Sequence, residues 1–218
     1  MSENTEFVTL KQGGTVIQNK YTKKDLEGAA KKLKIALDLG LVFALALFVF
    51  FLFNLSITYT ASPSMVPTLS VGDIGVYGPV GEIERGDIVL FDPVTEENAH
   101  MPAVMEYAGE ELTKRVIGLP GERVRMEAGV VYINGEPLDE PYAVYSGSPD
   151  PYALYLRDMD EIIVPDGCYF LLGDNRDHSS DSRVFGVFPR ENITRSRIFS
   201  FPSITGLITG VGNDDQFV

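Results

Sequence analysis

Hydrophobic residues are concentrated in one long run near the start of this chain. Residues 39–59, which begin LGLVFALALFVFFLF, are almost all apolar, and Phe and Leu surround the whole circumference of the helix that they would form. At 1.5 Å per residue this helix would be about 31 Å long, which matches a bilayer core of about 30 Å. The pattern therefore predicts a transmembrane helix over residues 35–59.

Two other structures share this pattern. A cleavable signal peptide also has a basic start and an apolar run, and Thr60 and Ala61 are small enough to precede a cleavage site. Its apolar region, however, is usually only about 7 to 15 residues long. A buried core helix would normally show a polar face, which is missing here. A retained membrane anchor is the favoured interpretation.

Beyond residue 60 the chain changes to short segments rich in β-branched and aromatic residues, separated by Gly and Pro. The segments VGDIGVYGPV, RGDIVLFDPV and TKRVIGLPGERVRM are typical of strands that end in turns. In VVYINGEPL, the pair Asn134 and Gly135 between apolar residues predicts a tight hairpin. Residues 139–160, rich in Pro, Tyr, Ser and Asp, are expected to form a surface excursion. The pattern predicts a mainly β domain over residues 60–218.

Charge is divided between the two parts of the chain. The net charge is −13, but residues 1–34 carry seven lysines against four acidic residues, whereas residues 61–218 carry 11 basic and 26 acidic residues. Lysines beside an apolar run mark its cytoplasmic side, so we expect residues 1–34 to be a cytoplasmic basic tail and the β domain to be exported. Residues 1–20 are polar and are expected to be mobile. A body this acidic would repel phosphates, which argues against nucleic acid binding.

Few residues are available for disulfides or metal sites. Cys168 is the single cysteine, so an internal disulfide is excluded, and its apolar neighbours predict a small buried core residue. The two histidines, His100 and His178, are too few for a convincing zinc site. We therefore expect no metal and no cofactor.

Candidate chemistry begins directly after the apolar run, in the segment ASPSMVPTL, where prolines favour an extended backbone. Ser64 lies at most about 17 Å beyond Tyr59, so a nucleophile there would work at a membrane surface. A serine attacks well only when a neighbouring base takes its proton, and the candidates are Lys114 and His178. In a strand Lys114 would point the same way as Val116, and burial can lower the pKa of a lysine enough to make it a base. Taken singly, each of these residues is more often an ordinary surface or loop residue.

Three stretches, SPSMVPTL, KRVIGLPGE and GDNRDHSSDSR, follow the predicted anchor in this order. Together they resemble the bacterial type I signal peptidases, membrane-bound serine proteases with a Ser/Lys dyad, over most of residues 35–202. The resemblance implies an antiparallel β-sheet domain with a smaller inserted β region around residues 124–164. It also implies a single-pass enzyme of the inner (plasma) membrane, in contact with membrane lipid, that removes signal peptides from exported preproteins.

The resemblance assigns roles to individual residues. Ser64 matches the nucleophile and Lys114 the general base. The hydroxyl of Ser62 matches the group that joins the Ser64 N–H in the oxyanion hole, and Ser179 matches the serine that orients the lysine amine. Four further residues are expected to have structural roles near the site: Met65, Arg115, Asp181 and Arg183, the last two as an ion pair.

Two positions depart from the family pattern. Pro63 stands where the family often has glycine, and its missing N–H matters only if the oxyanion hole needs that amide. His178 stands where asparagine is common. Family substrates carry small residues at the −3 and −1 positions, which shallow apolar pockets accept, and Tyr77 and Ile83 are candidate pocket walls.

Three alternative functions remain open. The first is a maturation peptidase of the same family with a narrow substrate. The second is a catalytically silent, membrane-tethered binding domain that keeps the fold. The third is a Ser/His hydrolase that uses His178 in place of Lys114.

Overall fold

The computed structural model describes residues 7–12, 15–145 and 157–203. The chain divides into two compact units, Met1–Phe53 and Asn54–Val218, which are considered one at a time.

The first unit begins with an antiparallel hairpin of β1 (Phe7–Gln12) and β2 (Thr15–Thr22). These segments were expected to be a mobile tail, and the structure corrects that expectation. Both contain neighbouring β-branched residues, Val8 and Thr9 in β1 and Thr15, Val16 and Ile17 in β2, which favour strands when a second strand is available for pairing. The remainder of the unit belongs to the helix α1 (Lys23–Asn54).

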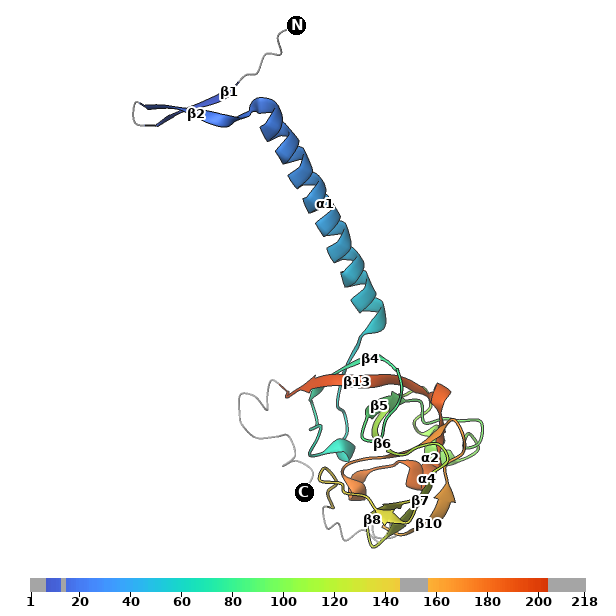
Figure 1. Ribbon diagram of the computed structural model, residues 1–218. Helices are drawn as coiled ribbons and strands as arrows, with labels where there is room; N and C mark the ends of the chain where they lie inside the picture. Colours follow the sequence, from blue (N-terminus) through green and yellow to red (C-terminus); the bar gives the residue numbers. More distant parts are fainter. Residues whose placement is uncertain (1–6, 13–14, 146–156, 204–218) are drawn as a thin grey trace. The chain divides into compact units, whose positions relative to one another are not determined.

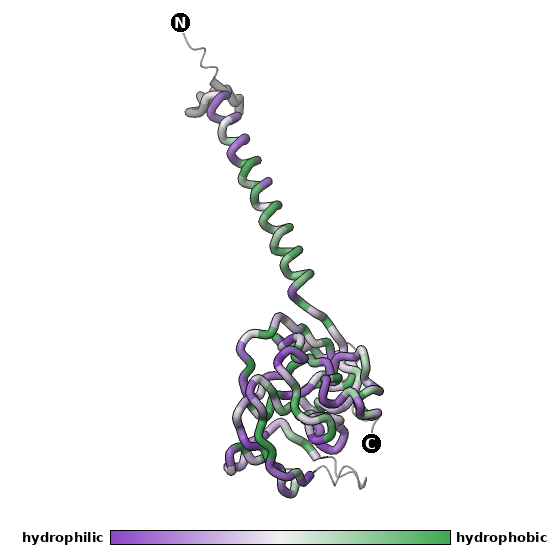
Figure 2. Tube along the Cα trace, turned by 90° about the vertical axis from the view of Figure 1, so that its right-hand side faces the viewer, coloured by the Kyte–Doolittle hydropathy of each residue, from purple (hydrophilic) through white to green (hydrophobic). Residues whose placement is uncertain are grey.

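The start of α1 is defined by a capping box. The backbone N–H of Thr22 donates to Asp25 (3.0 Å), and the N–H of Asp25 donates back to the Thr22 hydroxyl (3.2 Å). Figure 2 shows hydrophilic residues in the first turns of α1 and hydrophobic residues along the rest. Among the described residues, α1 is the one helix that is long and apolar enough to cross a membrane, and none of its residues is buried.

The end of α1 lies earlier than the sequence pattern suggests. The helix stops at Asn54, and Ser56–Tyr59 form the strand β3, although residues 35–59 were expected to be helical throughout. The reason is tertiary, because each residue of SITY pairs with a residue of β4 (Ile74–Pro79), and β-branched and aromatic residues suit such pairing.

The second unit is built on a seven-stranded antiparallel sheet in the order β12-β11-β6-β5-β13-β4-β3. The strands not yet named are β5 (Ile88–Phe91), β6 (Leu112–Gly118), β11 (Cys168–Leu172), β12 (Phe188–Pro189) and β13 (Ile193–Phe201). Short helices join them: η1 (Pro63–Met65), α2 (Pro102–Met105), η2 (Arg176–His178), α4 (Ser182–Phe185) and η3 (Arg190–Asn192). This arrangement confirms the mainly β fold with an N-terminal apolar helix.

A smaller four-stranded sheet of order β10-β7-β8-β9 interrupts the chain between β6 and β11. Its strands are β7 (Arg123–Glu127), β8 (Val130–Ile133), β9 (Glu136–Pro137) and β10 (Met159–Ile163). In Figure 1 it lies at the opposite end of the unit from β4 and β13. The hairpin predicted at Asn134 and Gly135 is present, and both residues have the positive φ (53° and 90°) that a tight two-residue turn requires.

Two apolar clusters form the core of this unit. One packs β5, β6, β11 and β12 together, with Phe91 against Phe188. The other joins the smaller sheet to β11 through Phe170 and Leu172. Cys168, expected to be buried, is partly exposed because it stands at the very start of β11 and packs only against the edge of the second cluster.

Candidate active site

The segment around Ser64 leaves β3 and tightens into the 3-10 turn η1. Ser62 caps this turn: its backbone is extended and its Oγ accepts the N–H of Ser64 at 3.3 Å. Pro63 is the first residue of the turn, where a backbone N–H has no partner within the turn. Met65 is buried with Leu69 and Ile88, and this small apolar cluster attaches the segment to β5.

Lys114 reaches the same place from β6. Its Nζ lies 2.9 Å from Ser64 Oγ and 3.1 Å from the carbonyl oxygen of Thr113. Only 3% of Lys114 is exposed. Burial is the main reason why the pKa of its amine is lowered from 10.5 to about 8; the charge of Arg183 lowers the pKa further, while Asp181 and Asp174 act against this. The structure thus places a poorly solvated amine against a serine hydroxyl.

Ser62 and Ser179 occupy the two sides of this pair. The hydroxyl of Ser62 donates to Ser64 Oγ at 3.0 Å. Ser179 is buried and lines the same cavity, and within the described part of the chain no hydrogen bond joins its Oγ to Lys114. Its hydroxyl lies near the Asp181 carboxyl group and contributes to the lowered pKa of that group, although the two do not meet the geometry of a hydrogen bond. The orienting role of Ser179 stays a prediction.

Asp181 and Arg183 form a buried ion pair beside the site, with Arg183 Nε donating to Asp181 at 2.8 Å. Asp181 also accepts the N–H of Gly173 at 3.0 Å. Burial by itself would raise the pKa of this carboxyl group, but the charge and hydrogen bonds of Arg183, with the Gly173 N–H, hold the pKa below its usual value. Asp181 is therefore a fixed negative charge near the lysine amine.

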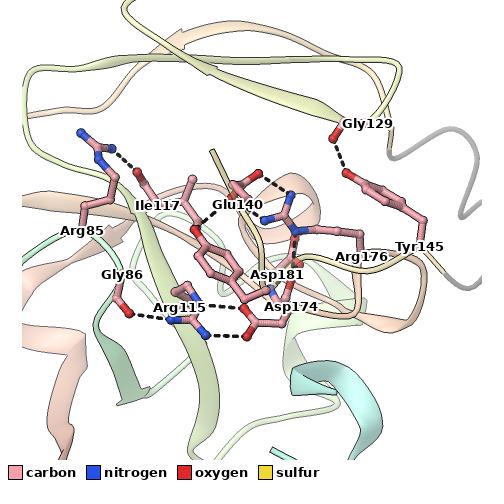
Figure 3. A network of polar contacts seen from close by, with 12 residues as sticks. Arg85, Gly86, Arg115, Ile117, Gly129, Glu140, Tyr145, Asp174, Arg176 and Asp181 are labelled. Carbon is pink, nitrogen blue, oxygen red and sulfur yellow. Dashed lines mark hydrogen bonds and ion pairs between the residues drawn. The ribbon is translucent and has the colours of Figure 1, made fainter. Parts of the chain in front are cut away.

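Arg115, the neighbour of Lys114, points to another part of the molecule. It makes two parallel hydrogen bonds to Asp174, of 2.8 and 2.6 Å, and a third to the Gly86 carbonyl at 2.8 Å. Its guanidinium also lies over the ring of Tyr142, 3.9 Å from the centroid. Figure 3 shows Arg115 and Asp174 facing each other in a network that continues to Arg176. These contacts support the structural role expected of Arg115, which stays a prediction.

A cavity of about 440 Å³ opens beside Ser64 and Lys114. One wall is β3, the terminal strand of the large sheet, which contributes Thr58 and Tyr59. The facing wall is residues 112–114 of β6, where pairing with β11 has not yet begun, since that register starts at Arg115. Two strand edges therefore border the cavity. His178 lies on its rim and is exposed, without a hydrogen bond to Ser64 in the described structure.

Several site residues are not apparent from the sequence. Tyr77 and Ile83, the candidate pocket walls, are core residues and do not line the cavity, whereas Tyr107 and Glu110, from the connection between β5 and β6, do. That connection is acidic and irregular, so no local sequence pattern predicts that it borders the cavity. Asn175, which contacts the backbone of the Ser64 segment, could have been suspected only from its place in the GDN motif.

Comparison with known proteins gives a consistent result. Residues 8–201 match the family model described as signal peptidase, peptidase S26. The probable signal peptidase I-1 of Synechocystis sp. is 37% identical over 151 residues, which cover 66% of this chain and 69% of that protein. Signal peptidase I of Bacillus licheniformis is 37% identical over 146 residues, covering 63% of this chain and 72% of that protein. The crystal structure of a signal peptidase I from Enterococcus faecalis V583 is 32% identical and aligns with a TM-score of 0.41, over 54% of this chain and 97% of that chain. This chain therefore belongs to the signal peptidase family, peptidase S26, and is a serine endopeptidase.

Proposed function

We propose that this protein is a membrane-anchored signal peptidase in which Ser64 is the nucleophile and Lys114 the general base. The observation that carries this proposal is the 2.9 Å separation of Ser64 Oγ and Lys114 Nζ, with the amine 3% exposed. Nucleophile and base within hydrogen-bond distance, with a base whose pKa is close to neutral, are what serine catalysis requires.

The reaction then proceeds in two halves. Neutral Lys114 takes the proton of the Ser64 hydroxyl while Oγ attacks the scissile carbonyl carbon, and the carbonyl electron pair moves to its oxygen. The tetrahedral intermediate collapses as Lys114 returns the proton to the leaving amine, which releases the mature protein and leaves an ester on Ser64. In the second half Lys114 deprotonates a water molecule, which attacks the ester and frees the signal peptide.

The oxyanion would be stabilised by the hydroxyl of Ser62 and the N–H of Ser64. In the structure both donors are used within the protein: Ser62 Oγ accepts the Ser64 N–H, and the Ser62 hydroxyl donates to Ser64 Oγ. Rotation of the Ser62 side chain about its Cα–Cβ bond would turn its hydroxyl toward the substrate oxygen and release the Ser64 N–H. Removal of one such donor costs about 3 to 4 kcal/mol in sites of this type.

The two strand edges beside the cavity support an extended substrate. A peptide placed between β3 and residues 112–114 of β6 could form main-chain hydrogen bonds with both, and its side chains would alternate between the two faces. We propose cleavage after small residues at −3 and −1, with the apolar residues Met65, Leu90 and Leu112 of the cavity wall as contacts for these side chains. Signal-peptide-bearing preproteins follow as substrates from the family, while this side-chain preference is part of the proposal.

The membrane arrangement rests on α1. Its apolar portion would span the inner membrane in contact with lipid, with the lysine-rich residues 1–34 in the cytoplasm and residues 60–218 on the opposite side. The reaction needs no metal. Limited proteolysis of inverted and right-side-out membrane vesicles would test the orientation, since the β domain should be cut only from the extracytoplasmic side.

The dyad is tested with the full-length enzyme in detergent and a preprotein that carries a cleavable signal peptide. Ser64→Ala and Lys114→Met should each abolish cleavage, because one lacks the nucleophile and the other the base. His178→Asn should keep most of the activity, since His178 is exposed and no hydrogen bond joins it to Ser64 in the described part of the chain. Loss of cleavage in His178→Asn with activity retained in Lys114→Met would favour the Ser/His hydrolase. Full activity in Ser64→Ala would reject the dyad.

A further inference from the structure

Asn175 contacts both peptide groups that flank the α-carbon of Ser64. Its side-chain Nδ2 donates to the carbonyl oxygen of Pro63 at 3.3 Å, and its backbone N–H donates to the carbonyl oxygen of Ser64 at 3.0 Å. Asn175 is 7% exposed, so water does not compete with these bonds. Asn175 therefore contacts both peptide planes around the serine, and the carbonyl oxygen of Pro63 also accepts the backbone N–H of Val66 at 3.1 Å.

One of these planes has a particular importance. The carbonyl of Pro63 and the N–H of Ser64 belong to the same rigid peptide group and point in opposite directions. A hydrogen bond to the carbonyl oxygen fixes the direction of the N–H at the other end, and it also polarises that N–H as a donor. Since the Ser64 N–H is the backbone donor of the oxyanion hole, Asn175 helps to fix the direction of that donor, together with the Val66 N–H that binds the same carbonyl oxygen.

The side chain of Asn175 is not placed to maximise stability. Its Oδ1 is buried and has no hydrogen-bond partner in the described part of the chain. The orientation of the amide is set by the bond from Nδ2 to Pro63, because the reversed amide would place Oδ1 against the carbonyl oxygen, and two acceptors repel each other.

Asn175 is itself held by the beginning of the surface excursion at residues 139–160. Val144 forms a parallel bridge with Asn175: its N–H donates to the Asp174 carbonyl (2.8 Å), and its carbonyl accepts the N–H of Arg176 (3.0 Å). The Arg176 guanidinium is bound by both carboxylate oxygens of Glu140, at 3.0 and 2.6 Å, and almost the whole ion pair is buried. Figure 3 shows this pair next to the one formed by Arg115 and Asp174.

Arg157, near the far end of the excursion, is attached to Asp177, the residue that follows Arg176. Arg157 binds Asp177 through two hydrogen bonds, of 3.2 and 2.7 Å, and the Asp177 side chain is fully buried. Adjacent residues of opposite charge, Arg176 and Asp177, are therefore each paired with one end of the excursion. Residues 174–177 are held between the excursion on one side and the Ser64 segment on the other.

We propose that Asn175 and Glu140 are positioning residues for the oxyanion hole: Asn175 orients the Pro63–Ser64 peptide, and Glu140 holds Asn175 in place through Arg176. The inference depends on the proposed role of Ser64. On this proposal, the contacts of Glu140, Val144 and Arg157 stabilise the loop that contains Asn175.

The test uses the full-length enzyme in detergent with a peptide substrate that spans a signal-peptide cleavage site. Asn175→Ala should lower kcat by about 10- to 100-fold and change KM by less than about 3-fold, because the oxyanion donor acts only in the transition state. Glu140→Gln should lower kcat by about 3- to 10-fold by weakening the pair with Arg176. Glu127→Gln, which removes an exposed ion pair with Arg125 within β7, is the matched control and should leave kcat unchanged.

Two further measurements separate positioning from general damage. Affinity for a peptide aldehyde, which forms a tetrahedral oxyanion on the serine, should fall in Asn175→Ala by the same factor as kcat/KM, while KM for the substrate stays nearly constant. In the double variant Glu140→Gln/Asn175→Ala the loss should be smaller than the product of the single losses, since both act on one peptide group. If Asn175→Ala does not fold, Asn175→Leu, which keeps the size of the side chain but lacks the donor, takes its place with the same expectations.

The outcomes distinguish the two proposals. Wild-type kcat and aldehyde affinity in a folded Asn175 variant, with cleavage abolished in Ser64→Ala, would overturn the positioning role and leave the dyad standing. Independent effects of Glu140 and Asn175 in the double variant would overturn the role of Glu140. Full cleavage by Ser64→Ala would reject the dyad and the positioning role together.

Discussion

The α-carbon of Gly173 faces the carbonyl oxygen of Ser64 so closely that a methyl group at Gly173 would lie 2.5 Å from that oxygen. The methyl group would also collide with the side chain of Ser179. A backbone carbonyl cannot move aside as a flexible side chain can, so relief of this contact must displace the Ser64 segment. Gly173 is therefore the residue that allows the GDN loop to approach the nucleophile.

Gly173→Ala is expected to lower kcat/KM by about 100-fold, because a displacement of about 1 Å at the nucleophile has an effect of that size. The matched control is Gly81→Ala, since a methyl group at Gly81 meets no atom within 4 Å. Steady-state cleavage of a signal peptide substrate provides the measurement. Activity within 3-fold of wild type in Gly173→Ala would show that the contact between the GDN loop and Ser64 is not required.

The activity should depend on pH through Lys114. The amine can accept a proton only when it is neutral, and its pKa is lowered by burial to about 8. Below that pH the neutral fraction falls about tenfold per unit, so kcat/KM should rise about tenfold per unit up to pH 7 and level off above pH 8. A profile that is flat from about pH 5 to 8 would contradict a lysine base.

The lowered pKa of Lys114 also affects the free energy of unfolding. The pKa of Lys114 is about 8 in the folded protein and 10.5 ordinarily, so at pH 7 the amine is protonated in both the folded and the unfolded state and the folded protein contains a buried ammonium. Between these two values only the unfolded state holds the proton, so the free energy of unfolding contributed by this group rises with pH. Lys114→Met should therefore stabilise the protein at pH 7 by roughly 1 to 3 kcal/mol, with the gain disappearing as the pH approaches 10.5. Thermal denaturation at several pH values provides the comparison, and an unchanged or lower stability at pH 7 would argue against a buried charge.

Ser62→Ala tests the side-chain donor of the proposed oxyanion hole. Removal of the hydroxyl should lower kcat by about 100- to 1,000-fold and leave KM nearly constant, because the donor is needed only when the negative charge develops. Ser180→Ala serves as the control, since Ser180 is an exposed serine that lines the same cavity. A change in KM with an unaltered kcat would assign Ser62 to substrate binding instead.

Arg115→Ala should destabilise the protein through Asp174. The Asp174 side chain is 1% exposed, and without its partner it becomes a buried carboxylate that lacks compensation. The expected loss in the free energy of unfolding is about 3 to 5 kcal/mol. Arg125→Ala removes an ion pair whose side chains are 31% and 66% exposed, and it should cost less than about 1 kcal/mol. Urea denaturation of the two variants compares them directly, and similar losses would contradict a structural role for the buried pair.

Much of this protein is determined by local sequence patterns. A run of Leu and Phe with no polar face is apolar wherever it lies, so the anchor helix could be predicted without knowledge of its neighbours. The turn at Asn134 and Gly135 depends on residues that accept a positive φ, which is a property of two adjacent positions. The motifs around Ser64 and Lys114 could likewise be recognised from the residue types they contain.

What the tertiary structure decided is which distant groups meet. Ser64 and Lys114 are 50 positions apart, and only the pairing of β6 with β5, together with the packing of Met65 against Ile88, brings the hydroxyl to 2.9 Å from the amine. The end of α1 also depends on tertiary contacts, because Ser56–Tyr59 become a strand by pairing with β4. Asn175 and Glu140 show no function in their local sequence, since a positioning residue acts through the backbone that it touches. Propensities and motifs belong to neighbouring residues, whereas burial, register and long-range hydrogen bonds exist only once the whole chain has folded.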